Sequence, residues 1–171
     1  MNAPAPAEVL IGLGGNVGDV RLTIARAIAQ LCDGTGIRLL KRSADYCTPP
    51  WGVTDQPPFV NACIAVATEL APRAVLDREL AVERALGRDR AREERWGPRR
   101  IDIDLLAYGD LTIDEPGLEL PHPRLMQRAF VLIPLAEIVP DRLVAGQRIA
   151  EAAARVDAGG IARLPPVPST P

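Results

Sequence analysis

The segment Arg100–Tyr108, RIDIDLLAY, decides the fold of this chain. Its apolar and polar residues alternate, which is typical of a β-strand that is buried on one face only. Because alternate residues of a strand point the same way, Asp102 and Asp104 share one face and lie about 6.6 Å apart at Cα. Two carboxylates this close repel each other, so either a divalent cation such as Mg²⁺ compensates them or the face is solvated near a strand end. The segment alone leaves both interpretations open.

The residues before this segment predict two strands and a helix. Val9–Leu13 is a short apolar run that ends in glycines, as a buried strand does. In Asp19–Cys32 the apolar residues recur at helical spacing, and Asn16 or Asp19 is available as the N-terminal cap. A second strand is predicted at Ile37–Tyr46, where the apolar pattern is weaker.

Two irregular loops then alternate with a strand and a helix. Cys47–Pro58, CTPPWGVTDQPP, is too rich in proline for regular structure, and its length of about a dozen residues is one at which function is common. Val60–Thr68 alternates clearly and predicts a strand. Pro72 opens a second helix, which Gly87 ends. The polar loop Arg88–Arg99 leads into the aspartate strand.

The resulting order, β-α-β-β-α-β, predicts an α+β fold of the ferredoxin-like type, with an antiparallel sheet and both helices on one of its faces. The large aliphatic residues of the two clearest strands should face these helices; they are Val60, Ile64, Val66, Ile101, Ile103 and Leu105. The opposite face should be uncovered and carry Asn61, Asp102 and Asp104. An amide and two carboxylates would then share one accessible surface.

The C-terminal third adds smaller elements. The pattern indicates a short strand near Leu111–Ile113, a turn of helix at Arg128–Ile138 and a helix at Gln147–Val156. We expect these additions to wrap the edges of the sheet.

Length and composition indicate one soluble domain. The chain has 171 residues, of which 47% are hydrophobic and 25% charged, and this predicts a single domain over residues 1–163. The proline-rich ends, 1–7 and 164–171, should be loose tails. The net charge of -2 argues against a general binder of nucleic acid or of anionic membranes, which would carry a large positive excess.

The cysteines and the N-terminal sequence indicate a cytoplasmic protein. Cys32, Cys47 and Cys63 are odd in number and far apart, so they predict neither a disulfide framework nor a zinc site. The first residues, MNAPAPAE, lack the basic and apolar regions of a signal peptide, and no apolar run reaches the length of a membrane span.

A cluster of arginines precedes the aspartates. Seven arginines and three acidic residues give this segment a surplus of four positive charges; the arginines are Arg84, Arg88, Arg90, Arg92, Arg95, Arg99 and Arg100. The planar guanidinium matches phosphate oxygens, so an arginine-rich loop beside two carboxylates suits a polyphosphate with bound Mg²⁺. For any single arginine, a solvated surface position is the simpler interpretation. For the cluster we favour a phosphate site.

The glycine-rich stretch Gly12–Asp19, GLGGNVGD, does not predict a dinucleotide site. Its spacing is GxGxxxG, and the Walker ending Gly-Lys-Ser/Thr is missing. A tight turn between strand and helix, capped by Asn16, explains the glycines better.

The histidine and the aromatic residues allow two interpretations each. His122, the single histidine, either contacts phosphate or satisfies a local backbone group. Trp51, Phe59 and Trp96 lie in or beside the two loops, where they either pack in the core or stack on a flat ligand.

Four segments of the chain resemble one enzyme family. They are Tyr46–Asn61 (YCTPPWGVTDQPPFVN), Arg95–Asp104 (RWGPRRIDID), LPHPR around His122, and RAFVLIPLAEI, which begins at Arg128. From about residue 9 to 140 the sequence is similar to 6-hydroxymethyl-7,8-dihydropterin pyrophosphokinase of folate biosynthesis, a family with the ferredoxin-like fold. The resemblance implies transfer of the β,γ-pyrophosphoryl group of ATP to the pterin hydroxymethyl oxygen, with release of AMP.

The resemblance also implies roles for individual residues. Asp102 and Asp104 would hold two Mg²⁺ ions on the triphosphate. Arg88 and Arg99 would be catalytic and stabilise charge during in-line attack. The pterin would contact Asn61, Phe59, Phe130 and Trp51, and the ATP site would include Trp96, His122, Glu83 and Arg128. No residue is assigned as a general base.

The two loops would have a further role in this family. Cys47–Pro58 and Arg88–Arg99 would move as lids that exclude water from the substrates. Arg90 and Arg92 receive no role, because the segment Gly87–Trp96 is one residue longer than in some relatives.

Two other functions stay open on the residues alone. RNA-recognition domains share this architecture, but they carry exposed aromatic residues on the central strands, where this chain has Asn61, Cys63, Asp102 and Asp104. A nucleotide-binding regulatory domain without catalysis fits the residues better. We expect a monomer that binds ATP and hydroxymethyl dihydropterin, and neither nucleic acid nor membrane.

Overall fold

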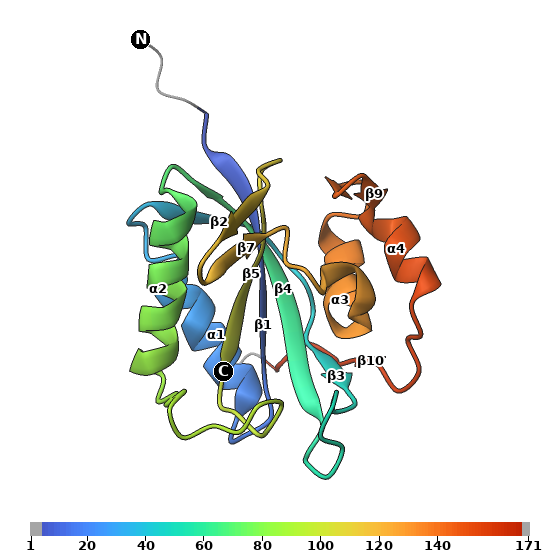
Figure 1. The fold of residues 1–171 in the computed structure, drawn as a ribbon. Coiled ribbons are helices and arrows are strands. Elements are labelled where there is room, and N and C mark those ends of the chain that lie inside the picture. Colours follow the sequence, from blue (N-terminus) through green and yellow to red (C-terminus); the bar gives the residue numbers. More distant parts are fainter. Residues whose placement is uncertain (1–4, 169–171) are drawn as a thin grey trace.

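The computed structural model describes residues 5–168, in which an antiparallel sheet lies between two layers of helices (Figure 1). The sheet has six strands in the order β10-β3-β4-β1-β5, and β2 also pairs with β4. These strands are β1 (Ala7–Gly15), β2 (Ile37–Arg42), β3 (Tyr46–Thr48), β4 (Phe59–Thr68), β5 (Asp102–Tyr108) and β10 (Ala162–Arg163).

The helices divide between the two faces of the sheet. α1 (Val20–Leu31) and α2 (Pro72–Ala85) cover one face, and α3 (Ala129–Ile138) and α4 (Ile149–Arg155) lie on the other side (Figure 1). The smaller elements are a 3-10 turn at Leu125–Gln127, the hairpin β6 (Ile113–Glu115) and β7 (Leu118–Leu120), and the hairpin β8 (Leu143–Val144) and β9 (Gln147–Arg148).

The predicted order β-α-β-β-α-β is confirmed. β1 pairs antiparallel with both β4 and β5, so the strands carrying Asn61 and the aspartates flank the same central strand. In the register, Gly14 lies opposite Asn61 on one side and opposite Asp102 on the other. Side chains from two strands that are distant in the sequence therefore flank one glycine.

The large aliphatic residues face α1 and α2, as predicted. Val60, Ile64, Val66, Ile101, Ile103 and Leu105 all belong to the core between the sheet and these helices. A register shift between Leu10 and Ile11 in the pairing of β1 with β5 adds a bulge, and beyond it Leu106 and Ala107 face the second core. One face of β5 is thus polar at its start and apolar at its end.

The prediction that the second face is uncovered is wrong for half of its length. α3 packs on this face rather than wrapping a sheet edge, and α4 packs on α3; the resulting second core buries Leu10, Cys63 and Ala65. The sequence of α3, AFVLIPLAEI, is apolar nearly all round, so this helix needs burial on more than one side. Only the half of the face that carries Asn61 and the aspartates stays open.

Local boundaries differ from the prediction at three places. Asp19, and not Asn16, caps α1, because its Oδ1 accepts a hydrogen bond from the Leu22 amide at 3.2 Å. The predicted strand Ile37–Tyr46 is divided into β2 and β3, and β3 takes up the start of the predicted loop Cys47–Pro58. The predicted helix Gln147–Val156 is also shorter in the structure, where α4 spans Ile149–Arg155.

The prediction of loose tails is wrong at their inner ends. Ala7 begins β1, and the Leu164 amide donates to the Asp45 carbonyl at 2.8 Å. The Pro165 carbonyl accepts from the Arg21 guanidinium at 2.7 Å. Residues 1–4 and 169–171 of the predicted tails lie outside the described residues. Between residues 5 and 168, none of the helices has the length and apolarity that crossing a bilayer requires.

Candidate active site

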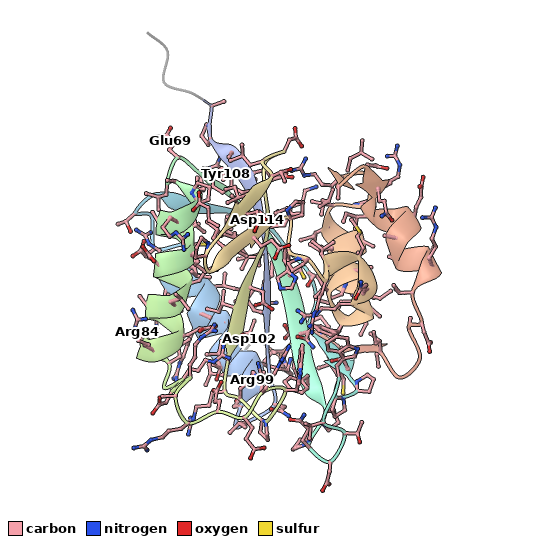
Figure 2. All side chains as sticks on the ribbon, viewed as in Figure 1. Glu69, Arg84, Arg99, Asp102, Tyr108 and Asp114 are labelled. Atoms are coloured by element: carbon pink, nitrogen blue, oxygen red, sulfur yellow. The ribbon has the colours of Figure 1, made fainter. Side chains whose placement is uncertain are left out.

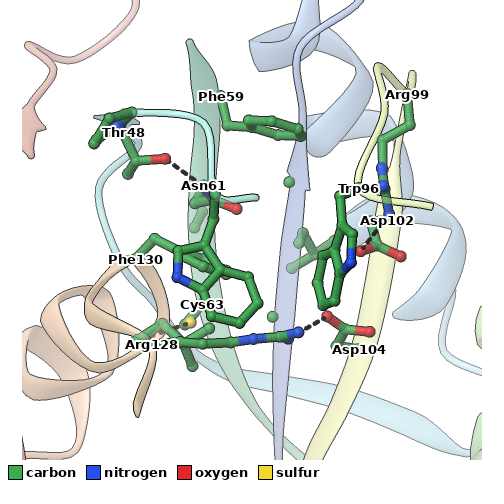
Figure 3. Close-up of a pocket in the computed structure, with 17 residues that line it drawn as sticks. Thr48, Phe59, Asn61, Cys63, Trp96, Arg99, Asp102, Asp104, Arg128 and Phe130 are labelled. Carbon is green, nitrogen blue, oxygen red and sulfur yellow. Dashed lines mark hydrogen bonds and ion pairs between the residues drawn. The ribbon is translucent and has the colours of Figure 1, made fainter. Parts of the chain in front are cut away.

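The open half of the second face forms a pocket of about 660 Å³. Three strands supply its floor: β1 through Gly12 and Gly14, β4 through Asn61, and β5 through Asp102 and Asp104. All five positions point to the same face because their strands alternate in register. The pocket therefore gathers the amide and both carboxylates that the sequence placed on one surface (Figure 3).

The orientation of Asn61 is fixed by two neighbours. Its Nδ2 donates to Oγ1 of the buried Thr48 at 2.8 Å, so Oδ1 is the end of the amide that can accept a hydrogen bond from a ligand. The amide also lies over Gly14, where any Cβ atom would overlap Oδ1. Thr48 was not predicted as a site residue, although it lies within the segment that carries the family resemblance.

Aromatic rings form the walls of the pocket. Phe59, Trp51, Trp96 and Phe130 all line it, and stacking of these rings on a flat ligand stays a prediction. The rings of Trp51 and Trp96 meet edge to face with centroids 4.9 Å apart, and Trp51 lies 6.5 Å from Phe130. The guanidinium of Arg128 lies 5.3 Å from the Trp51 centroid and 5.5 Å from that of Phe130. Cation–π contacts of this kind hold the positive charge of Arg128 close to both aromatic rings.

Arginines compensate the two aspartates. Nη1 of Arg88 lies 2.6 Å from Oδ1 of Asp102, and Nη1 of Arg99 lies 3.5 Å from Oδ2 of the same residue. Asp104 has a longer contact, 3.7 Å from Oδ2 to Nη1 of Arg128. Burial, together with the charge of Asp102, raises the pKa of Asp104 to about 7. Asp104 is thus the less compensated carboxylate of the pair.

A basic groove of about 910 Å³ adjoins the pocket. It shares Trp96, Arg99 and Arg128 with the pocket, and Figure 2 shows Arg99 beside Asp102 at one end of β5. The groove is lined by Arg88, Arg90, Glu93, Glu94, Arg95, Trp96, Arg99, His122, Pro123, Arg124 and Arg128. Six arginines against two glutamates give the groove a surplus of positive charge, which would suit a polyanion.

His122 lines this groove as a neutral ring. Burial, with the positive charges of Arg128 and Arg124, lowers the pKa of His122 to about 4. Its Nδ1 accepts a hydrogen bond from the Arg124 amide at 3.1 Å, so the proton is on Nε2. One nitrogen of His122 therefore satisfies a local backbone group, as one of the two interpretations expected, and contact of the other with phosphate stays a prediction.

Glu83 lies in a different place from the one expected. Its carboxylate is buried and lines neither the pocket nor the groove, while Oε1 accepts from Nη1 of Arg88 at 2.7 Å and from the Ile103 amide at 2.8 Å. Arg90 pairs with the other oxygen at 2.8 Å. Glu83 therefore positions Arg88 and β5. Arg92, by contrast, is exposed and pairs only with Asp89 among the described residues.

The sequence analysis missed one residue of the groove, Arg124, and one buried carboxyl group of α2, Glu79, which lines neither the pocket nor the groove. Arg124 lies 4.8 Å from the Trp96 centroid and 5.6 Å from that of Trp51, over both tryptophans. Glu79, one turn before Glu83, is fully buried, and burial raises its pKa well above the ordinary value for a glutamate. Arg124 belongs to the quoted LPHPR sequence and could have been found there; Glu79 has no signal in the sequence.

The residues at the aspartates suit Mg²⁺. Among residues 5–168 there is no group of three or more His, Cys, Asp and Glu side chains that could hold a metal ion. Asp102 and Asp104 supply two carboxylates, and Mg²⁺ is typically held by one or two carboxylates plus substrate phosphates. The adjoining groove of arginines is where such phosphates would lie.

Comparisons with known proteins agree with this geometry. The family model described as 7,8-dihydro-6-hydroxymethylpterin-pyrophosphokinase (HPPK) matches residues 10–140. The 2-amino-4-hydroxy-6-hydroxymethyldihydropteridine pyrophosphokinase of Methylorubrum extorquens is 51% identical over 154 residues, which cover 90% of this chain and 96% of that protein. The enzyme of the same name from Pseudomonas aeruginosa is 41% identical over 159 residues, covering 92% and 97%.

Solved structures show the same fold. The Plasmodium falciparum HPPK-DHPS structure with STZ-DHP matches with a TM-score of 0.70 at 14% identity, over 90% of this chain and 44% of that one. The chain thus spans less than half the length of this solved protein. The fold, the arrangement of the pocket and the matched sequences agree, and the chain belongs to the 7,8-dihydro-6-hydroxymethylpterin-pyrophosphokinase family.

Proposed function

We propose that the pocket holds the pterin and the groove holds ATP in the reaction of this family. As a pyrophosphokinase of folate biosynthesis, the chain transfers pyrophosphate from ATP to the hydroxymethyl group of 6-hydroxymethyl-7,8-dihydropterin and forms the pterin diphosphate and AMP. The observation that carries the proposed arrangement is that Asp102 and Asp104 line the pocket while their partners Arg88, Arg99 and Arg128 line the groove.

The pterin side of the site is built for a flat ring with a polar edge. Phe59 and Phe130 offer faces for stacking, and Trp51 closes the wall next to Phe130. Asn61 presents Oδ1 to the N–H groups of the ring, because its Nδ2 is engaged by Thr48. The pterin hydroxymethyl group would then lie toward the aspartates of β5.

The groove is built for a triphosphate. Arg88, Arg99 and Arg128 bring fixed positive charge to its border with the pocket, while Trp96 and His122 line it further along. The His122 ring donates from Nε2 without carrying charge, so it suits a phosphate or ribose oxygen. Positioning and electrostatic stabilisation of this kind supply most of the catalysis in phosphoryl transfer.

Asp102 and Asp104 would hold the two Mg²⁺ ions of the reaction. When bound, Mg²⁺ neutralises the phosphate oxygens and helps to align them for in-line displacement. Arg88, Arg99 and Arg128, which pair with these carboxylates in the structure, would contact the phosphate oxygens from the groove.

The transfer forms one bond and breaks another. The pterin hydroxymethyl oxygen attacks the β-phosphorus, and the bond from that phosphorus to the oxygen bridging the α- and β-phosphates breaks, so AMP leaves with the bridging oxygen. Arg99 and Arg88 stabilise the negative charge that moves onto AMP. The hydroxyl group loses its proton in this step, and no protein residue is assigned as the base that accepts it.

One experiment tests the proposal. The protein is incubated with ATP, Mg²⁺ and 6-hydroxymethyl-7,8-dihydropterin, and AMP and pterin diphosphate are measured together. We expect the two products in equal amounts and in dependence on Mg²⁺. Nucleotide binding without AMP release would instead indicate a regulatory nucleotide-binding domain.

We further propose a monomer in the cytoplasm. Cys32, Cys47 and Cys63 are free thiols, and reduced thiols are typical of the cytosol. All of the residues that are proposed to bind the substrates belong to a single chain, as a monomeric enzyme requires. Sedimentation of the purified protein tests the monomer.

A further inference from the structure

Asn16 connects the two sides of the active site although it lines neither of them. It follows β1, is 8% exposed, and is absent from the residues that line the pocket and the groove. Its backbone N–H donates to the Arg99 carbonyl at 2.9 Å, and its Oδ1 accepts from the Arg99 N–H at 3.0 Å. The main chain of Arg99 is therefore held from both its N–H and its carbonyl.

The other end of the Asn16 amide holds the opposite loop. Nδ2 donates to Oε1 of Gln56 and to the Pro57 carbonyl, both at 3.0 Å. Pro57 is two residues before Phe59, which lines the pterin side of the pocket. Both N–H groups and the oxygen of this buried side chain are thus hydrogen-bonded, the oxygen toward Arg99 and the two N–H groups toward the pterin side.

Gln56 extends the connection to the tryptophan of the groove. Its Nε2 donates to the carbonyls of Val53 and Trp96, each at 2.7 Å. In each hydrogen bond the donor is fixed: the Asn16 amide donates to the Gln56 side chain, and the Gln56 amide donates to the Trp96 carbonyl. The segment after β3 and the arginine-rich segment before β5 are thereby joined at the backbone of Trp96, whose ring contacts Trp51.

Only an amide fits this position. Aspartate at 16 would keep the acceptor for the Arg99 N–H but would turn a carboxylate toward two oxygens, those of Gln56 and Pro57. Glutamate at 56 would still accept from Asn16 but could not donate to Val53 and Trp96. The two substitutions therefore break the connection at different points.

We propose that Asn16 is a positioning residue for the transfer reaction, which holds Arg99 and, through Gln56, the Trp96 segment in register with the pterin loop. This inference rests on the proposed function, because Arg99 has its role only in pyrophosphoryl transfer. A misplacement of about 1 Å at a catalytic group lowers the rate about 100-fold, so the connection should affect kcat more than KM.

The test compares Asn16→Ala, Asn16→Asp and Gln56→Glu with the wild-type chain in the turnover assay. Gln30→Glu is the control, since Gln30 is exposed on α1 and the change adds the same charge far from the site. Thermal unfolding shows whether each variant is folded. Circular dichroism in the indole region reports the contact between the only two tryptophans of the chain, whose centroids are 4.9 Å apart.

We expect kcat to fall about 10- to 100-fold in Asn16→Ala, at least as much in Asn16→Asp, whose carboxylate faces the oxygens of Gln56 and Pro57, and about 10-fold in Gln56→Glu. The KM for ATP should stay within about threefold of wild type. The coupled tryptophan signal should weaken in Gln56→Glu and persist in Gln30→Glu. Should Asn16→Ala be unfolded, Gln56→Glu carries the test, because Gln56 is only partly buried.

Two results would overturn the inference. The first is a folded Asn16→Ala or Gln56→Glu variant whose kcat is within about twofold of wild type. The second is a variant that loses thermal stability while its kcat and its tryptophan signal stay unchanged, which would make the role of the amide purely structural. Absence of AMP release from the wild-type protein would refute the proposed function instead, so the two failures are distinguishable.

Discussion

Nη1 of Arg88 lies 2.6 Å from Oδ1 of Asp102, and the same nitrogen lies 2.7 Å from Oε1 of Glu83. One guanidinium thus joins a carboxylate of the pocket to a buried carboxylate of α2. The side chain of Arg88 is 5% exposed and that of Glu83 only 2%, so neither charge has access to bulk water. This contact makes Arg88 both a residue of the site and a part of the core.

Replacing Arg88 should therefore reduce stability as well as activity. Arg88→Ala leaves the buried Glu83 with fewer partners, and breaking a buried ion pair costs about 3–5 kcal/mol of the free energy of unfolding. Arg90→Ala is the matched control, because Arg90 pairs with the same Glu83 but its side chain is 54% exposed, and should cost about 1 kcal/mol or less. Urea unfolding measures both; equal losses would contradict the assignment.

The aspartates should be required for activity but not for folding. Asp102→Asn or Asp104→Asn removes a proposed Mg²⁺ ligand, and we expect turnover to fall about 100-fold or more. Titration with a non-hydrolysable ATP analogue and Mg²⁺ should show the loss of metal-dependent binding. Asp114→Asn on β6 changes the same charge at an exposed position and should leave turnover unchanged. Full activity in either site variant would rule out the metal role.

The polar arrangement of β5 could be predicted because it depends on local alternation. Ile101 and Ile103 face α1 and α2, so Asp102 and Asp104 must face the other way whatever the rest of the chain does. The family resemblance then supplied the partners in the loops. Phe130 of the pocket wall was found through that resemblance, whereas Phe59 was already a candidate because of its place beside the loop.

The parts that could not be predicted depend on contacts between distant segments. Asn16 looked like a helix cap, but its partners are Gln56 and Arg99, 40 and 83 residues away. The packing of α3 on the second face had one weak signal, the small side chains of Cys63 and Ala65 on that face of β4. Short-range patterns do not report such pairings, since tertiary contacts decide between options that local rules allow.

The Asn61 amide should contribute to pterin affinity and not to ATP affinity. Asn61→Ala removes the only side-chain amide that lines the pocket within residues 5–168, and an unpaired buried group costs about 1–3 kcal/mol, or about 5- to 150-fold in Kd. Thr48→Val should weaken pterin binding less, because it keeps Asn61 but frees its Nδ2 to rotate. Equilibrium binding of pterin and of nucleotide, measured separately, checks the selectivity. A parallel loss of ATP affinity would be evidence against this role.

His122 should make stability depend on pH. In the folded chain its pKa is lowered to about 4 by burial and by Arg128 and Arg124, against about 6.5 in the unfolded chain. Between these values the unfolded state binds the extra proton, so the contribution of His122 to stability is complete above pH 6.5 and is lost as the pH falls toward 4. Replacement by Gln should flatten this part of a plot of unfolding free energy against pH. An unchanged slope would show that other groups cause it.

The last prediction concerns Gly14, which allows the Asn61 amide to lie across β1. In Gly14→Ala the new Cβ overlaps Oδ1 of Asn61 and lies 3.3 Å from the Val60 carbonyl, so the amide must rotate away. Gly12→Ala is a matched control on the same strand and in the same pocket, where the nearest atom is Cδ1 of Leu106 at an ordinary 3.5 Å.

Both glycines lie in the extended strand β1 and neither has a positive φ, so the two substitutions differ in space and not in backbone strain. We expect Gly14→Ala to weaken pterin binding about as much as Asn61→Ala, about 5- to 150-fold, because it displaces the same amide. Gly12→Ala should bind pterin within about threefold of wild type. In the double variant, Gly14→Ala with Asn61→Ala, the two effects should not add, since removing the amide removes the clash. Additive losses would mean that Gly14 affects the pocket by another route.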